Sequence, residues 1–116
     1  MKKRSLYCAA IALSLSLFID NAGASVIGLP NYLKTPGAID ARVTQANIGS
    51  TICVVGYTKT VRPPVSYTNS LKYQQLHSGY NVNGDMNMRN YEEDHLIPLA
   101  VGGNPTSPKN LFPQYY

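Results

Sequence analysis

Residues Tyr91–Pro113 read YEEDHLIPLAVGGNPTSPKNLFP, and this stretch decides both the fold and the chemistry that we expect. Asp94 and His95 stand side by side near its start. Carboxylate oxygens suit a hard cation such as Mg²⁺, and an imidazole takes up a proton near neutral pH. Metal-assisted hydrolysis of a phosphodiester needs both groups. The pair therefore predicts a metal ligand, Asp94, beside a general base, His95.

The residues after His95 predict that the chain turns back on itself. Pro98 interrupts a regular strand or helix, and Gly102 and Gly103 supply the backbone freedom of a sharp reversal. Asn110 then arrives just before an apolar pair. Its side-chain carbonyl can accept the far ring N–H of His95 and fix the tautomer of the ring. We therefore predict that Asn110 orients His95 and does not itself react.

The order D-H-x-I-P-L, then G-G, then N-L resembles the first two thirds of an HNH motif, the ββα-metal (His-Me finger) nuclease site. A closer resemblance is to a group of exported bacterial HNH-like proteins. The chain shares with them E-D-H-L-I-P-L, G-G, K-N-L-x-P and, upstream, T-I-C-x-x-G-Y-T-K-T-V-R-P-P-V-S-Y-T. The similarity covers roughly residues 35–113, and a joint match of this length is more specific than any short motif alone.

The resemblance implies a metal-dependent nuclease that hydrolyses DNA or RNA phosphodiester bonds, most readily with Mg²⁺. It makes Asp94 the first metal ligand, His95 the general base and Asn110 the residue that orients it. Glu92 shares the side of Asp94 in an extended segment, so it is a further candidate for the shell of the metal. In the family the N-L pair leads into a helix that carries the last metal ligand, whereas this sequence ends five residues after Leu111. We therefore expect an incomplete ββα-metal hairpin and a weak or inactive nuclease.

Each feature of this stretch also has an ordinary structural explanation. An Asp-His pair can be an exposed strand end, and Gly-Gly with Asn-Leu can be a turn before a helix cap. Taken together and in order with the upstream block, the features favour the family. Membership does not imply activity, because function depends on the site and not on the fold. The alternative function is a non-catalytic remnant that binds nucleic acid or the cell envelope, and a further alternative is a truncated product without a stable fold.

Residues 1–24 have the pattern of a secretory signal peptide. A basic start precedes the apolar run Leu6–Ile19 and an A-x-A site that ends at Ala24. The run is shorter than the roughly 20 residues that a membrane-spanning helix needs. We therefore expect cleavage after Ala24 and export to the periplasm or the medium, with no membrane span once the signal is removed.

Charge and length limit what the remaining segment, residues 25–116, can be. Cleavage of the signal removes three of the ten basic residues and one of the six acidic residues, so the formal net charge falls from +4 to +2. A charge this small neither requires nor excludes a nucleic-acid partner. The length allows one small domain, and we expect an α+β HNH-like domain truncated before its metal-binding helix.

The upstream half predicts few regular elements. Ser66–Tyr80 is the best helix, with its first residue as N-cap and Gly79 at its left-handed end. Thr51–Val55 is a β-branched apolar run that suits a strand or a buried extended segment, and Tyr57–Pro64 alternates like a solvated strand and ends in two prolines. Cys53 is alone once the signal is removed. The resemblance implies a partner cysteine further along in longer relatives, and the alternative is a small buried hydrophobe.

Overall fold

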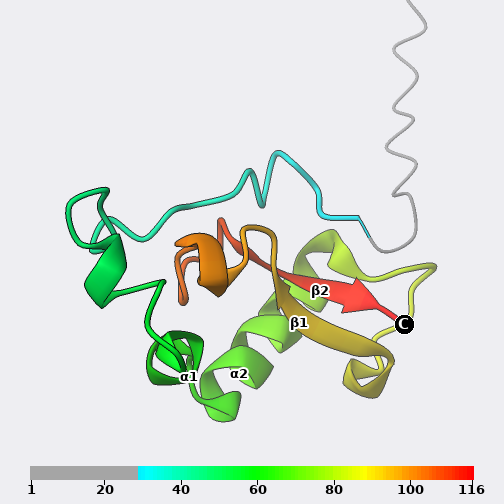
Figure 1. Cartoon of the computed structure of the whole chain (residues 1–116). Coiled ribbons are helices and arrows are strands. Elements are labelled where there is room, and N and C mark those ends of the chain that lie inside the picture. Colours follow the sequence, from blue (N-terminus) through cyan, green and yellow to red (C-terminus); the bar gives the residue numbers. More distant parts are fainter. Residues whose placement is uncertain (1–28) are drawn as a thin grey trace, which may run out of the picture.

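Two helices and one β-hairpin form the α+β core of residues 29–116, the part of the chain that the computed structural model describes (Figure 1). The α+β class predicted from the sequence is confirmed, and the predicted signal peptide lies outside the described residues. The helices are α1 (Tyr57–Val61) and α2 (Val65–Gln75), and the strands are β1 (Tyr91–His95) and β2 (Leu111–Tyr115). Short helical turns occur at Ile48–Ser50, Leu76–Tyr80, Met88–Asn90 and Leu99–Val101.

The two strands pair antiparallel, with Tyr91 opposite Tyr115 and His95 opposite Leu111. Residues 96–110 therefore form the loop that joins them. Helix α2 contacts both strands and crosses one face of the hairpin (Figure 1). Side chains alternate along β1, so that Tyr91 is buried while Glu92 is exposed. This alternation decides which carboxylates of β1 face water and which face α2.

Helix α2 is held against the hairpin by polar as well as apolar side chains. Lys72 donates from Nζ to the Tyr91 carbonyl at 2.9 Å, and Gln75 donates from Nε2 to the Leu111 carbonyl at 2.7 Å. Each bond ties one turn of the helix to one strand. The buried apolar side chains that complete this core are Leu71, Leu76, Tyr91, Leu99, Leu111 and Phe112.

The predicted helix over Ser66–Tyr80 is confirmed in its position but not at its ends. Pro64 takes the N-cap position with an extended backbone, and no side chain caps the helix, so α2 begins one residue before Ser66. Regular α-helix stops at Gln75, and the chain continues through a wider turn in which Gly79 has a φ of +95°. The left-handed residue is thus where the sequence predicted it, after a looser final turn.

Two strand predictions upstream of α2 are wrong. Thr51–Val55 forms successive turns, and Tyr57–Val61 is helix α1. A β-branched run forms a strand only where another strand can pair with it, and the sheet of the described residues consists of β1 and β2 alone. The Cys53 N–H instead donates to the Ile48 carbonyl at 3.0 Å. Cys53 is exposed, so its interpretation as a buried hydrophobe is also wrong.

The arm over residues 29–40 lies along the loop between the strands. The Gly37 N–H donates to the Lys109 carbonyl and the Asp40 N–H donates to the Gly102 carbonyl, both at 2.8 Å. Gly102 has a φ of +91°, which confirms the predicted reversal at the glycine pair. The arm therefore holds the outer side of the loop that carries the candidate site. No helix among residues 29–116 is long and apolar enough to cross a membrane.

Candidate active site

Strand β1 and the start of α2 enclose a groove of about 360 Å³ that contains three of the predicted site residues. Glu92, Asp94 and His95 line it from the strand, and Arg62 and Lys72 line it from the helical side. Asp94 is exposed, and its Oδ1 accepts the backbone N–H of His95 at 2.7 Å. Its second carboxylate oxygen makes no hydrogen bond to any described residue. The groove thus presents an open carboxylate next to an imidazole.

The ring of His95 is fixed by the loop through one nitrogen. Nε2 lies 3.0 Å from the carbonyl oxygen of Pro105. A carbonyl can only accept, so the contact requires the proton on Nε2. In the neutral ring Nδ1 is then the unprotonated nitrogen. The tautomer that leaves Nδ1 ready to take a proton is therefore set by Pro105.

Asn110 does not make the predicted hydrogen bond to His95. Its side chain is fully buried, and Oδ1 accepts the Ile97 N–H at 2.9 Å. Nδ2 donates to the carbonyls of Ile97 and Asn104, at 3.1 and 2.9 Å. The physical reason is that a buried amide must satisfy its polar atoms, and the nearest partners are the backbone groups of the loop. The Asn110 amide therefore affects His95 only indirectly, because it binds Asn104, the residue before Pro105.

Two residues of the site were missed by the sequence reasoning. Pro105 contributes only a backbone carbonyl, which carries no side-chain signal beyond the turn that Asn104-Pro105 predicts. Glu93 lies between two exposed carboxylates, so the alternation of β1 turns it towards α2. That alternation is the signal that could have found Glu93.

Glu93 is a poorly solvated carboxyl beside the candidate site. Burial raises its pKa to about 8, and the nearby charge of Lys72 opposes part of this shift. Neither Glu93 oxygen, nor Oε1 of Gln75, finds a conventional hydrogen-bond partner among the described residues. A protonated carboxyl gains a donor, which an ionised carboxylate lacks. A pKa of about 8 means that the protonated form of Glu93 predominates in the folded protein around pH 7.

We expect the folded protein to lose stability as pH rises from about 4.5 to about 8 because of Glu93. Below the unfolded pKa, near 4.5, the carboxyl is protonated in both states and has no effect. Between 4.5 and 8 only the folded state keeps the proton, so each step up in pH favours unfolding. Glu93→Gln should remove this dependence and raise the melting temperature at pH 8 by about 5 °C relative to the parent. Thermal unfolding at pH 5 and pH 8 measures it, and equal pH dependence in both proteins would contradict it.

The oxygen atoms around Asp94 suit a hard cation. Glu92 and Asp94 are both exposed on β1 and both line the groove. Mg²⁺ is commonly bound through one or two carboxylates while it keeps several waters. Within residues 29–116, no group of three or more His, Cys, Asp and Glu side chains converges in a way that could hold a metal. The described residues therefore form no closed cage for a cation.

Comparison with known proteins assigns no family to the chain. No family model, no curated protein and no solved structure matches it. Any function must therefore be argued from the site itself, that is, from Asp94, His95 and the loop that fixes the His95 ring.

Proposed function

We propose that the protein is an exported, HNH-like, metal-dependent nuclease that hydrolyses nucleic-acid phosphodiester bonds in the groove beside β1. The hairpin β1–β2 with loop 96–110 is, in this proposal, an incomplete ββα-metal hairpin. The observation that carries it is the contact from Nε2 of His95 to the Pro105 carbonyl. That contact leaves Nδ1 as the basic nitrogen of a ring that lines the groove next to Asp94.

In the proposed reaction His95 is the general base. Nδ1 takes a proton from a water molecule as the water oxygen attacks phosphorus, the bond from phosphorus to the leaving oxygen breaks, and solvent returns a proton to that oxygen. Asp94, with Glu92 beside it, would hold a divalent cation, Mg²⁺ by the chemistry of the ligands. When bound, such a cation offsets negative charge on the phosphate oxygens. Asn110 is a positioning residue, because it acts on His95 only through the loop.

One observation favours a second candidate function. Among the described residues, no three acidic, histidine or cysteine side chains converge so that they could hold a metal ion. Few fixed ligands make a weak cation site, because they offset less of the cost of removing water from the ion. A protein of this kind can keep the groove and lose the reaction. The second candidate is therefore a non-catalytic remnant that binds nucleic acid or the cell envelope.

The nuclease proposal is tested with His95→Ala in a plasmid-nicking assay. Purified parent protein should nick DNA slowly, require millimolar Mg²⁺ or Mn²⁺ and lose all activity in EDTA. His95→Ala should lower the rate by about 10²- to 10⁴-fold, since it deletes the proton acceptor. His77→Ala is the matched control. The His77 ring is exposed, lies outside the groove and contacts the Tyr73 carbonyl through Nδ1 at 2.7 Å, so its loss should leave the rate unchanged.

The same experiment separates the two candidate functions. Absence of cleavage at every metal concentration, with salt-sensitive retention of nucleic acid that ignores His95→Ala, would favour the binding remnant. An equal loss of cleavage in His95→Ala and His77→Ala would point to damaged folding and contradict the assigned role of His95.

A further inference from the structure

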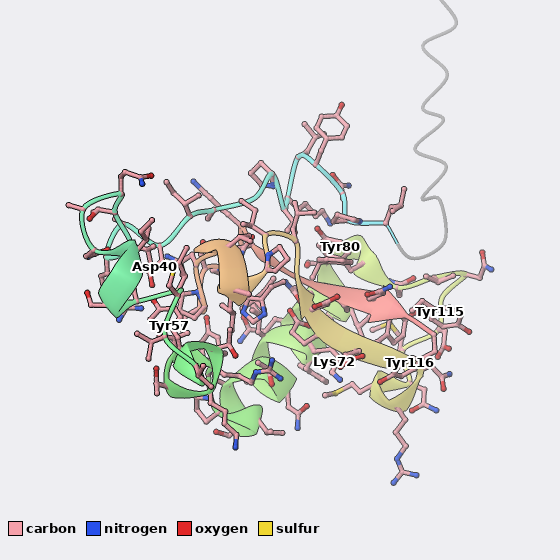
Figure 2. The ribbon with its side chains drawn as sticks, in the orientation of Figure 1. Asp40, Tyr57, Lys72, Tyr80, Tyr115 and Tyr116 are labelled. Carbon is pink, nitrogen blue, oxygen red and sulfur yellow. The ribbon has the colours of Figure 1, made fainter. Side chains whose placement is uncertain are left out.

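A second groove, of about 420 Å³, adjoins the one beside His95. The two grooves share Lys72, Tyr91 and Tyr116 as lining residues, so they meet at these side chains. Figure 2 labels Lys72 and Tyr116, both near strand β1. The second groove is further lined by Arg89 from the segment that precedes β1. The candidate active site therefore lies next to a second groove, and the two adjoining grooves together are termed the channel.

Lys72 is a nearly buried cation at the junction of the grooves. Its relative exposure is 9%, and its ammonium donates one hydrogen bond, to the Tyr91 carbonyl. An ammonium has three N–H groups, so two remain for a ligand. Among residues 29–116 no carboxylate oxygen lies within the 4.0 Å of an ion pair with it. A nearly buried ammonium without an ion-pair partner is costly, and an anion that enters the grooves would offset that cost.

Beside the acidic side chains of β1, the channel also has two exposed cations and an exposed aromatic ring, groups that bind a nucleic-acid strand. Arg62 lines one groove and Arg89 lines the other, and both are exposed. Tyr116 lines both grooves and is 77% exposed, so its ring is open to an incoming base. Cations along a groove follow the phosphates of a strand, and exposed aromatic rings stack on its bases.

We propose that the joined grooves bind a single-stranded nucleic acid, with a backbone phosphate on the ammonium of Lys72 and a base stacked on Tyr116. This proposal rests on the nuclease function, since it extends the strand away from the bond that His95 would attack. A flexible single strand can place one phosphate on the Lys72 ammonium while one of its bases stacks on the Tyr116 ring. In a duplex the bases are already stacked on one another, and no base is free for Tyr116.

The test measures binding by fluorescence anisotropy in EDTA, where cleavage does not interfere. The probes are single-stranded DNA and single-stranded RNA of about 20 nucleotides and a duplex of the same length. Lys72→Met keeps the aliphatic chain and removes the charge, and it should weaken single-strand binding by about tenfold or more. Its salt dependence should also fall by about one counterion. Tyr116→Ala should weaken binding by about tenfold through lost stacking.

Lys59→Met is the matched control, because Lys59 is an exposed lysine of α1 that lines neither groove. It should bind the strand like the parent protein. Thermal unfolding of Lys72→Met reports whether loss of the Tyr91 bond unfolds the chain. If it does, Tyr116→Ala and Arg89→Ala, both at exposed positions, decide the matter, and each should weaken single-strand binding.

Three results would overturn the proposal: tighter binding of the duplex than of either single strand, an equal loss in Lys59→Met, or parent-like binding by Tyr116→Ala and Arg89→Ala. Preference for DNA or for RNA identifies the strand, and either supports the channel. The same measurements distinguish failure of the nuclease proposal from failure of the strand-binding proposal. Strand binding without any cleavage keeps the channel and refutes the enzyme, whereas His95-dependent cleavage that Lys72→Met and Tyr116→Ala leave unchanged keeps the enzyme and refutes the channel.

Discussion

Gly103→Ala is expected to prevent the loop between the strands from forming. A Cβ at Gly103 would lie 1.8 Å from the carbonyl oxygen of Ile97 and 3.0 Å from Nδ2 of Asn110. The first of these contacts is with backbone, so no rotation of a flexible side chain relieves it. We expect a loss of more than about 4 kcal/mol, the range reached by severe substitutions, which is comparable with the whole stability of a domain this small. Thermal unfolding followed by circular dichroism should show no cooperative transition.

Gly49→Ala is the matched control for this substitution. A Cβ at Gly49 would meet nothing within 4 Å, and the backbone there is not left-handed. The melting temperature of Gly49→Ala should therefore stay within a few degrees of the parent, because isolated surface changes are nearly neutral. A folded Gly103→Ala with parent-like stability would show that the loop can open by more than about 1 Å at little cost, against the packing described above.

Asn110→Ala is expected to destabilise the protein by about 2–4 kcal/mol, because it leaves several loop backbone groups without partners. The groups that lose hydrogen bonds are the N–H and carbonyl of Ile97, the carbonyl of Asn104 and the N–H of Ala38. Any nuclease rate, measured where the variant is folded, should fall less than in His95→Ala, because the base is loosened but still present. Chemical denaturation and the plasmid assay measure the two effects.

Asn47→Ala is the control for Asn110→Ala. The Asn47 side chain also bonds to backbone, accepting from the Thr44 N–H and donating to the Arg42 carbonyl, both at 2.8 Å, but in a local turn away from the hairpin. Water can replace these bonds, so we expect a loss of no more than about 1 kcal/mol and no change in rate. A larger loss of stability in Asn47→Ala than in Asn110→Ala would refute the view that the buried amide secures the loop.

The sequence alone was sufficient for features that depend on near neighbours. The position of α2 and the reversal at Gly102 follow from periodicity and from residues with special backbone preferences, whereas the α+β class was predicted through the resemblance of Tyr91–Pro113 to a ββα hairpin. The same local patterns placed Asp94 beside His95. They failed at Thr51–Val55, because a β-branched run has the preference for a strand but needs a partner strand, and the partner is a tertiary property.

Only the tertiary structure decided the environment of the candidate site. Asn110 and His95 are 15 positions apart in the sequence. In the fold the His95 ring bonds to the Pro105 carbonyl, and the Asn110 amide bonds to backbone groups of the loop. The same holds for Glu93 and Lys72, which the sequence presents as ordinary charged residues. Packing of α2 on the hairpin shields both side chains from water. This burial raises the pKa of Glu93, and it places Lys72, at 9% exposure, at the junction of the two grooves.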